Sequence, residues 1–320
     1  MDLNIVQAAE QLLYADDILL LAHRSPDGDT IGSCFALYYA LRGIKKRVRI
    51  ECADPFPRRY GYFTEGVFFS EFEPRFIVAV DVADRRLLGE KDACYPNIDL
   101  CIDHHLSNTG YAARRLLDPS QAATAQLCFS LLSEMRLPIT PQIADCLFTG
   151  LTTDTGGFRF SNVTAQTHRI AAELMALGCD AAGINRQMFE CKSRSRIQVE
   201  RLAMESLEYA FDGRCALLCI SQKMRESSGA CEEDLEGVAG LPRQIEGVWV
   251  GITCREREEG YRISLRADEH IDASAVCRLL DGGGHKQAAG CTLQGDFAAV
   301  RAKLLDTLAP FIRAAQDQPS

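Results

Sequence analysis

The chain has 320 residues, of which 47% are hydrophobic and 25% are charged, a composition typical of soluble globular proteins. Its net charge of −9 argues against tight binding to long duplex DNA, which requires a broad basic surface. No apolar run approaches the roughly 18 residues of a membrane span, and the acidic N-terminus lacks a signal-peptide pattern. We therefore expect a cytoplasmic protein that does not bind membranes, long enough for two domains.

Apolar runs of strand length alternate with helical patterns in the first half of the chain. In chain order, the pattern predicts a helix over residues 2–16, a strand over 18–22, a helix over 30–43, a strand over 47–52, a loop over 54–63, strands over 76–80 and 99–102, and helices over 122–134, 143–152 and 165–177. The strands are apolar along their length rather than alternating, which favours a parallel sheet with helices on both faces. An α/β fold is expected.

The composition changes around residues 185–212, which are charged and mostly helical. After them the pattern predicts strands over 214–220, 248–254 and 261–266, a helix over 273–280, the segment DGGGHKQAAG, a further strand and a helix over 297–315. We expect a domain over 1–185, a helical linker over 186–212 and a smaller α/β domain over 213–320. None of the 14 cysteines forms a C-x-x-C pair, which argues against a zinc ribbon and favours reduced core thiols.

Metal-type ligands follow several predicted strands at the point where each strand ends. His23, Asp81 and the pair Asp103-His104 each come just after the last apolar residue of a strand. Because the carboxyl ends of parallel strands lie at one edge of a sheet, we expect these side chains to meet there. The turn after the first strand and the end of a later helix add further carboxylates. The candidate ligands are His23, Asp27, Asp29, Asp81, His104 and Asp154.

Four carboxylates in one folded site would repel each other strongly unless cations neutralise them. A bridging carboxylate can hold two divalent ions roughly 3.5–4 Å apart, an arrangement suited to displacement at phosphorus. Mixed carboxylate and imidazole ligation suits Mn²⁺, with Mg²⁺ or Co²⁺ as alternatives. Structural roles compete with this interpretation: Asp29 or Thr30 can cap the following helix, and Asp81 can cap a turn.

Five motifs in this order carry a family resemblance. HRSPDGDTIGS, DVAD, DHH and TDTGGFRFSN resemble the four motifs of the DHH phosphoesterase superfamily. GGGHKQAAG resembles the glycine-histidine signature of the DHH-associated C-terminal domain. Each motif alone is weak evidence, but five in register across the chain are specific. The sequence looks most like the branch of oligoribonucleases that also dephosphorylate 3′-phosphoadenosine 5′-phosphate (pAp).

The resemblance implies a two-metal enzyme with substrate bound between its domains, and a water held by the metals as the nucleophile. Asp81 would bridge the two ions, Asp103 would orient His104, and His105 would face the scissile phosphate. One ion would be held by His23, Asp27 and Asp81, and the other by Asp29, Asp81, His104 and Asp154. In the second domain the implied phosphate ligands are His285, the backbone of Gly283 and Gly284, and Arg266.

Other interpretations remain open at this stage. Cyclic di-AMP or its linear product pApA are alternative substrates, and polyphosphate is a weaker one. A silent nucleotide-binding protein on the same fold is a non-enzymatic alternative. GGGHKQAAG also fits a helix end and tight turn in which Gly282 has a positive φ. Tyr60, Phe158 and Phe160 are candidates for base stacking, and relatives of this kind suggest a homodimer.

Overall fold

The computed structural model describes residues 1–235 and 237–317. The chain divides into two compact units, Met1–Cys191 and Lys192–Ser320. The segment expected as a linker contains α9 (Arg194–Glu205), and this helix packs against strand β7 (Cys215–Ile220) and helix α10 (Gln222–Ser228) of the second unit. Among the described residues, no helix combines the length and apolar character needed to cross a membrane.

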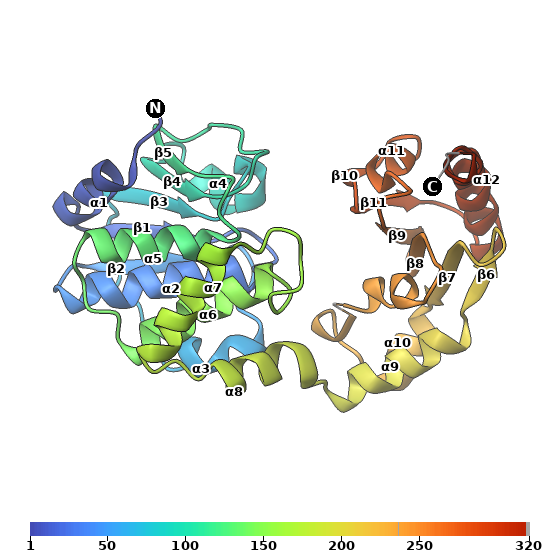
Figure 1. Ribbon diagram of the computed structural model, residues 1–320, viewed down its shortest axis with the longest axis horizontal. Helices are drawn as coiled ribbons and strands as arrows, with labels where there is room; N and C mark the ends of the chain where they lie inside the picture. The colour runs from blue at the N-terminus through green and yellow to red at the C-terminus, as the bar shows by residue number, and fades with distance from the viewer. Residues whose placement is uncertain (236, 318–320) are drawn as a thin grey trace. The chain divides into compact units, whose positions relative to one another are not determined.

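The first unit is built on a five-stranded parallel sheet in the order β2-β1-β3-β4-β5 (Figure 1). Its strands are β1 (Ile18–Leu21), β2 (Val48–Glu51), β3 (Phe76–Val80), β4 (Leu100–Asp103) and β5 (Arg114–Leu117). The expected α/β class with a parallel sheet is confirmed. The sequence analysis missed β5, because this edge strand begins with two arginines and buries fully only Leu116.

Alternation along the strands gives this sheet two separate apolar faces. Ile18 and Leu20 belong to the large core cluster, whereas Leu19 and Leu21 belong to a smaller one that includes Leu88. On the large face lie α1 (Ile5–Tyr14), α2 (Gly28–Gly43), α5 (Thr124–Glu134), α6 (Pro141–Asp154) and α7 (Ala165–Ala176). The smaller face is covered by η2 (Arg85–Leu88) and adjoining loops, and α4 (Lys91–Cys94) contacts η2.

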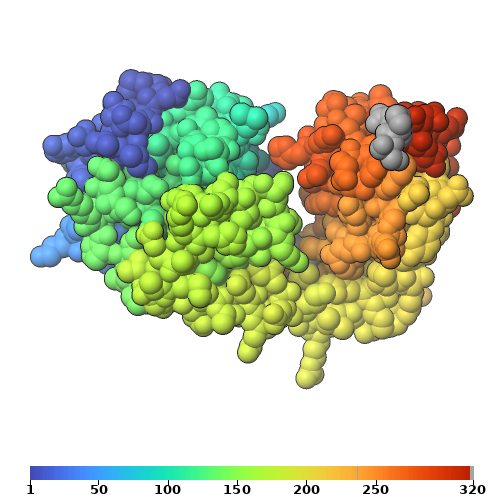
Figure 2. All heavy atoms as spheres, viewed as in Figure 1, coloured from blue at the N-terminus to red at the C-terminus, as the bar shows by residue number. Residues whose placement is uncertain are grey.

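The helical layer of the first unit is itself two helices deep. α6 packs on α2 and α5, and α7 packs on α6. Figure 2 shows this layer from outside, where green and yellow-green side chains cover the front of the unit. Short helices lie in the remaining segments, including part of the expected loop at 54–63: η1 (Arg58–Tyr60), α3 (Gly61–Thr64), α8 (Ala181–Asn185) and η3 (Arg186–Glu190).

The second unit has a six-stranded mixed sheet in the order β10-β11-β9-β8-β7-β6, in which only β7 and β8 pair in parallel. Its strands are β6 (Glu208–Ala210), β7 (Cys215–Ile220), β8 (Val250–Arg257), β9 (Gly260–Ala267), β10 (Gly283–His285) and β11 (Ala288–Leu293). Its helices after α9 are α10 (Gln222–Ser228), η4 (Glu233–Leu235), η5 (Val238–Gly240), η6 (Pro242–Gln244), α11 (Ala273–Arg278) and α12 (Phe297–Gln316).

The segment DGGGHKQAAG forms a β-hairpin rather than a simple helix end. Gly283–His285 pairs antiparallel with Ala288–Gly290 across a two-residue turn. The residues with positive φ are Asp281 (55°) and Gly284 (140°), and not Gly282 as expected. At Gly282 a side chain is excluded for a different reason, because a Cβ there would lie 2.3 Å from the carbonyl oxygen of Gly290.

Candidate active site

Three neighbouring strands of the parallel sheet deliver polar side chains to its carboxyl edge. His23 lies two residues beyond β1, Asp81 directly follows β3, and Asp103 is the last residue of β4. The chain after β1 enters α2, whose N-cap is Asp27, with its carboxylate accepting from the amides of Asp29 and Thr30. The capping role therefore belongs to Asp27, and Asp29 lies inside the first helical turn.

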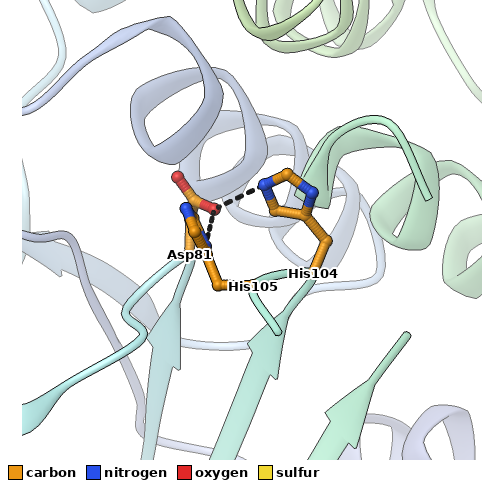
Figure 3. A group of neighbouring side chains, drawn as sticks. All are labelled: Asp81, His104 and His105. Carbon is orange, nitrogen blue, oxygen red and sulfur yellow. Dashed lines mark ion pairs between the residues drawn. The ribbon is translucent and has the colours of Figure 1, made fainter. Parts of the chain in front are cut away.

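Asp81 lies at the centre of the cluster. Its Oδ2 is 3.8 Å from Nε2 of His23, and its Oδ1 is 3.8 Å from Nε2 of His104 and 3.6 Å from Nδ1 of His105. In Figure 3, dashed lines join one oxygen of this carboxylate to the rings of His104 and His105. Asp81 has a φ of +63°, a conformation uncommon for a residue other than glycine and frequent at functional sites.

The remaining carboxylates complete two groups around Asp81. Nε2 of His104 is 3.3 Å from Oδ2 of Asp154 and 3.9 Å from Oδ2 of Asp29. Nε2 of His23 is 3.6 Å from Oδ1 of Asp27. The structure thus brings together all six candidate ligands expected from the sequence, with His23 and Asp27 on one side of Asp81 and the other three on the other side.

Glycines let α2 and α6 approach closely enough for Asp29 and Asp154 to meet. A Cβ at Gly32 would lie 2.3 Å from the carbonyl oxygen of Cys146, and one at Gly150 would lie 2.7 Å from Oδ1 of Asp29. Any larger residue at these positions would push the helices apart. The two glycines therefore position the carboxylates at the ends of these helices.

Backbone carbonyls fix the orientation of two of the imidazoles. Nδ1 of His23 donates to the carbonyl oxygen of Arg24 (2.8 Å), and Nδ1 of His104 donates to that of Gln121 (3.1 Å). In each neutral ring the lone pair is then on Nε2, the atom that faces the carboxylates. Nε2 of His104 is buried without a hydrogen-bond partner, as expected for an atom whose partner is an ion.

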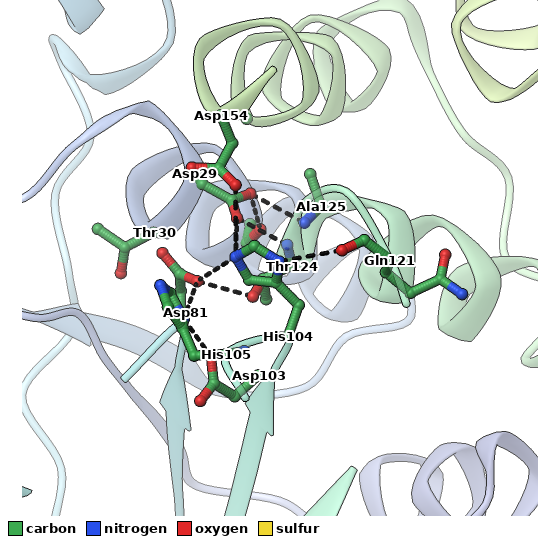
Figure 4. Close-up of polar contacts among 12 residues, drawn as sticks. Asp29, Thr30, Asp81, Asp103, His104, His105, Gln121, Thr124, Ala125 and Asp154 are labelled. Carbon is green, nitrogen blue, oxygen red and sulfur yellow. Dashed lines mark hydrogen bonds and ion pairs between the residues drawn. The ribbon is translucent and has the colours of Figure 1, made fainter. Parts of the chain in front are cut away.

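The start of α5 holds two of the carboxylates, a feature that the sequence analysis missed. The amides of Thr124 and Ala125 donate to Asp29 over 2.6 and 2.9 Å, and the Thr124 hydroxyl donates to Oδ1 of Asp81 over 2.7 Å (Figure 4). The free amides of a helix N-terminus are natural partners of a carboxylate. The only available sequence signal was a threonine at the start of an apolar helix.

Asp103 orients His105, which corrects the expected role of Asp103 toward His104. Oδ1 of Asp103 accepts a hydrogen bond from Nδ1 of His105 (2.8 Å), and Oδ2 of Asp103 accepts one from the side-chain amide of Asn108 (2.6 Å). In an extended chain, side chains two residues apart share a side, so Asp103 faces His105 while His104 points the other way. The His105 ring remains 37% exposed.

Burial and mutual repulsion shift the titration of the central carboxyls. Desolvation, together with neighbouring carboxylates, raises the pKa of Asp29 and of Asp154 to about 7 and that of Asp81 to about 6. Burial opposes protonation of His23, but the hydrogen bond and charge of Asp27 outweigh it and raise the pKa of His23 to about 9. Without cations, the site therefore retains protons near neutral pH.

The donor set fits divalent-cation binding. Carboxylate oxygens and imidazole nitrogens 3.3–3.9 Å apart are spaced as ligands that share an ion at about 2.0–2.2 Å. The orphaned Nε2 of His104 and the shared position of Asp81 agree with this interpretation.

Comparison with known proteins identifies the family. Residues 17–151 match the DHH family, N-terminal domain, and residues 218–314 match the DHHA1 domain. A Thermus thermophilus protein named bifunctional oligoribonuclease and PAP phosphatase NrnA is 35% identical, covering 91% of this chain and 87% of its own length. The chain belongs to the DHH family. The resemblance drawn from the five motifs is thereby confirmed.

Two solved structures share the fold. An exopolyphosphatase-related protein from Bacteroides fragilis superposes with a TM-score of 0.90 at 25% identity, covering 98% of this chain and 97% of that one. Exonuclease RecJ bound to manganese gives a TM-score of 0.54 at 14% identity, covering 98% and 95% of the two chains. The second likeness shows the fold alone.

The DHHA1 domain carries the other expected site residues on neighbouring strands of one sheet. His285 pairs with Ala288, and Ala288 pairs with Arg266 on its other side. Residues directly opposite each other in antiparallel strands share a face, so His285 and Arg266 flank a small alanine. Gly283 and Gly284 lie in β10 beside them. These residues belong to the second unit, whereas the carboxylate cluster belongs to the first.

The three aromatic candidates for base stacking differ in exposure. Tyr60 is buried in the core of the DHH domain, so its ring cannot stack on a nucleobase. Phe158 is partly buried and stacks on His168 at a centroid distance of 5.4 Å. Phe160 is 57% exposed. Of the three residues, only Phe160 is mainly exposed, and the edge of its ring lies over Gly156.

Proposed function

We propose that this DHH-family protein is a metal-dependent phosphoesterase that degrades short oligoribonucleotides to 5′-mononucleotides and removes the 3′-phosphate of pAp. The observation that carries the proposal is the placement of the Asp81 carboxylate between His23 and His104, with one oxygen toward each. Such a carboxylate is suited to bridge two cations. The name of the Thermus thermophilus relative supports the choice of substrates.

The described residues would hold two divalent cations. His23, Asp27 and Asp81 would bind one, and Asp29, Asp81, His104 and Asp154 would bind the other. We propose Mn²⁺ as the preferred ion because the ligands mix imidazole nitrogen with carboxylate oxygen, with Mg²⁺ or Co²⁺ as alternatives. When bound, a pair of such cations supplies an activated water near neutral pH and neutralises charge on the phosphoryl oxygens.

The protein's own groups would bind the substrate and stabilise charge. Asp103 holds Nδ1 of His105 and, in the metal-free site, raises the pKa of that imidazole to about 9. The proposed role of His105 is to donate from Nε2 to an oxygen of the scissile phosphate. His285, the backbone of Gly283 and Gly284, and Arg266 would bind another phosphate of the substrate.

A substrate panel tests the proposal. Purified protein with Mn²⁺ is expected to release AMP from a labelled di-adenylate and phosphate from pAp, and to lose both activities in His104→Ala and Asp81→Asn. Absence of turnover, with calorimetry showing metal bound, would contradict the proposal and favour a silent nucleotide-binding protein.

The same panel separates the alternative substrates by kcat/KM. Cyclic di-AMP or pApA would be identified by a specificity constant well above that for short RNA. Polyphosphate belongs in the panel because of the Bacteroides fragilis structure's description.

A further inference from the structure

One face of the DHHA1 sheet is hollowed over β9, β10 and β11. Pairing places Gly283, Gly290 and Ser264 side by side in one row, and Ala288 beside Arg266 in the next. These small residues leave a hollow of about 590 Å³. The opposite face of the same strands packs Ile263 and Leu265 into the core. A floor of glycine and other small residues lets a ligand approach the backbone.

Two arginines of β9 line this hollow. Arg262 and Arg266 are four residues apart on one strand, so they share a face and their Cα atoms are about 13 Å apart at about 3.3 Å per residue. Ser264 lies between them on the same face. The groove therefore has a positive group toward each end and small residues in the middle.

Neither arginine has an acidic partner among the described residues. Burial lowers the pKa of Arg266, and its guanidinium donates only to the neighbouring Leu265 carbonyl in the described part of the chain. Arg262 is exposed and faces Arg255 across the strand pair. Like charges directly opposite destabilise a sheet, and Arg255 is itself paired with Glu232. Charge of this kind without a counter-ion is complementary to an anion.

We propose that Arg262 forms a second phosphate subsite, which binds a substrate phosphate in addition to the one held at Arg266. This inference rests on the proposed function. A substrate with two phosphates, such as pAp or pApA, places one at the metal centre and has one left for Arg266. A 5′-phosphorylated trinucleotide has a third phosphate. Arg262 therefore favours trinucleotides and longer RNAs over substrates with two phosphates.

Arg262→Ala tests the subsite, with Arg262→Lys as the conservative variant. The KM for pApApA should rise about five- to tenfold in Arg262→Ala with kcat unchanged, because one charge-assisted contact is lost. The slope of log KM against log salt should fall by about 0.7, the value for one single-strand phosphate. Arg262→Lys should recover most of the affinity, and the change should be confined to the trinucleotide.

Arg313→Ala is the matched control, since Arg313 is an exposed arginine in the last turn of α12. It removes the same charge and should leave all KM values unchanged. An equal rise for pAp and pApApA in Arg262→Ala, or none for pApApA, would overturn the subsite.

Binding of fluorescein-labelled pApApA in EDTA, followed by anisotropy, gives a readout that does not depend on turnover. Weaker binding by Arg262→Ala than by wild type supports the subsite even if no substrate is hydrolysed, an outcome that would refute only the proposed function. Equal binding by both proteins, or none by wild type, refutes the subsite.

Discussion

Thr124 donates its hydroxyl to Oδ1 of Asp81 over 2.7 Å. Its own amide donates to Asp29, so one residue at the start of α5 holds two candidate ligands. Asp81 comes from the end of β3 and Asp29 from α2. Thr124 therefore fixes the relative position of carboxylates from two elements, and this places it among the groups that tune a metal site without touching the ion.

Thr124→Val should weaken metal binding. The substitution keeps the shape of the side chain and the hydrogen bond from the backbone amide of residue 124 to Asp29. It removes the hydrogen bond from the Thr124 hydroxyl to Asp81. Loss of such a supporting partner typically costs about 10–100-fold in metal affinity. We expect a loss of about 10-fold because the backbone hydrogen bond to Asp29 remains. Calorimetric titration of Mn²⁺ into metal-free protein measures the change.

Two further variants serve as controls for the effect of Thr124→Val on Mn²⁺ affinity. Thr124→Ser retains the hydroxyl and should bind Mn²⁺ nearly as wild type does. Thr167→Val removes an equally buried hydroxyl that bonds Gln126, so it should lower stability without lowering Mn²⁺ affinity. Equal affinity for Mn²⁺ in Thr124→Val and wild type would show that the bond has no role in the site.

Asp103→Asn should lower the pKa of His105. The hydrogen bond from His105 to Asp103 is the largest cause of the raised pKa, about 9, and a neutral amide cannot stabilise the imidazolium in the same way. In metal-free protein at pH 7.5 the ring should change from mostly charged to mostly neutral. An NMR titration of the histidine resonances follows this directly. Asn108→Ala, which leaves the His105 bond in place, should keep the pKa high.

The sequence predicts which residues lie at the strand ends, but it does not predict every residue that hydrogen-bonds to them. β1, β3 and β4 are apolar runs that stop at a ligand, and the positions of His23, Asp81 and His104 follow from the geometry of parallel strands. Partners across the fold were not predictable in this way. Thr124 reaches Asp81 from 43 residues away, and no local pattern encodes that distance.

Hydrophobic periodicity also has limits that explain the remaining errors. β5 is an edge strand with a polar start, so it lacks the apolar run that marks a buried strand. Five of the six paired positions in the hairpin of β10 and β11 are glycine or alanine, residues with low strand propensity that are typical of a turn. Pairing with β9 overrides that preference.

Metal-free protein should become less stable as pH rises from about 4 to 9. Asp29, Asp81 and Asp154 have raised pKa values, so the folded state keeps protons that an unfolded chain releases near pH 4. This contribution is lost as pH rises through about 6 to 7. The raised pKa of His23, about 9, adds a loss between about 6.5 and 9. Asp27, whose pKa is lowered, titrates below this window.

Added Mn²⁺ should therefore raise Tm more at pH 8 than at pH 5.5, because cations replace protons on the same oxygens. Differential scanning fluorimetry of chelator-treated protein, with and without Mn²⁺, measures both trends. In Asp81→Asn the Mn²⁺-induced shift should shrink at every pH. A shift that is larger at pH 5.5 would contradict the assignment of these carboxyls as ligands.

Gly150→Ala should damage both stability and metal binding, whereas Gly43→Ala should not. A Cβ at Gly150 would lie 2.7 Å from Oδ1 of Asp29 and 2.7 Å from Cβ of Ala125, so α6 must move or the Asp29 carboxylate must turn. Overpacking of this kind costs about 1–3 kcal/mol of unfolding free energy. At Gly43, the last residue of α2, no atom lies within 4 Å of an added Cβ, and the substitution should raise the unfolding free energy by about 0.4–1 kcal/mol.

Urea unfolding and Mn²⁺ titration of both variants give four measurements. If Gly150→Ala lost stability but kept full Mn²⁺ affinity, the contact between α6 and Asp29 would be structural only; loss of both shows that the glycine holds the carboxylate where an ion requires it.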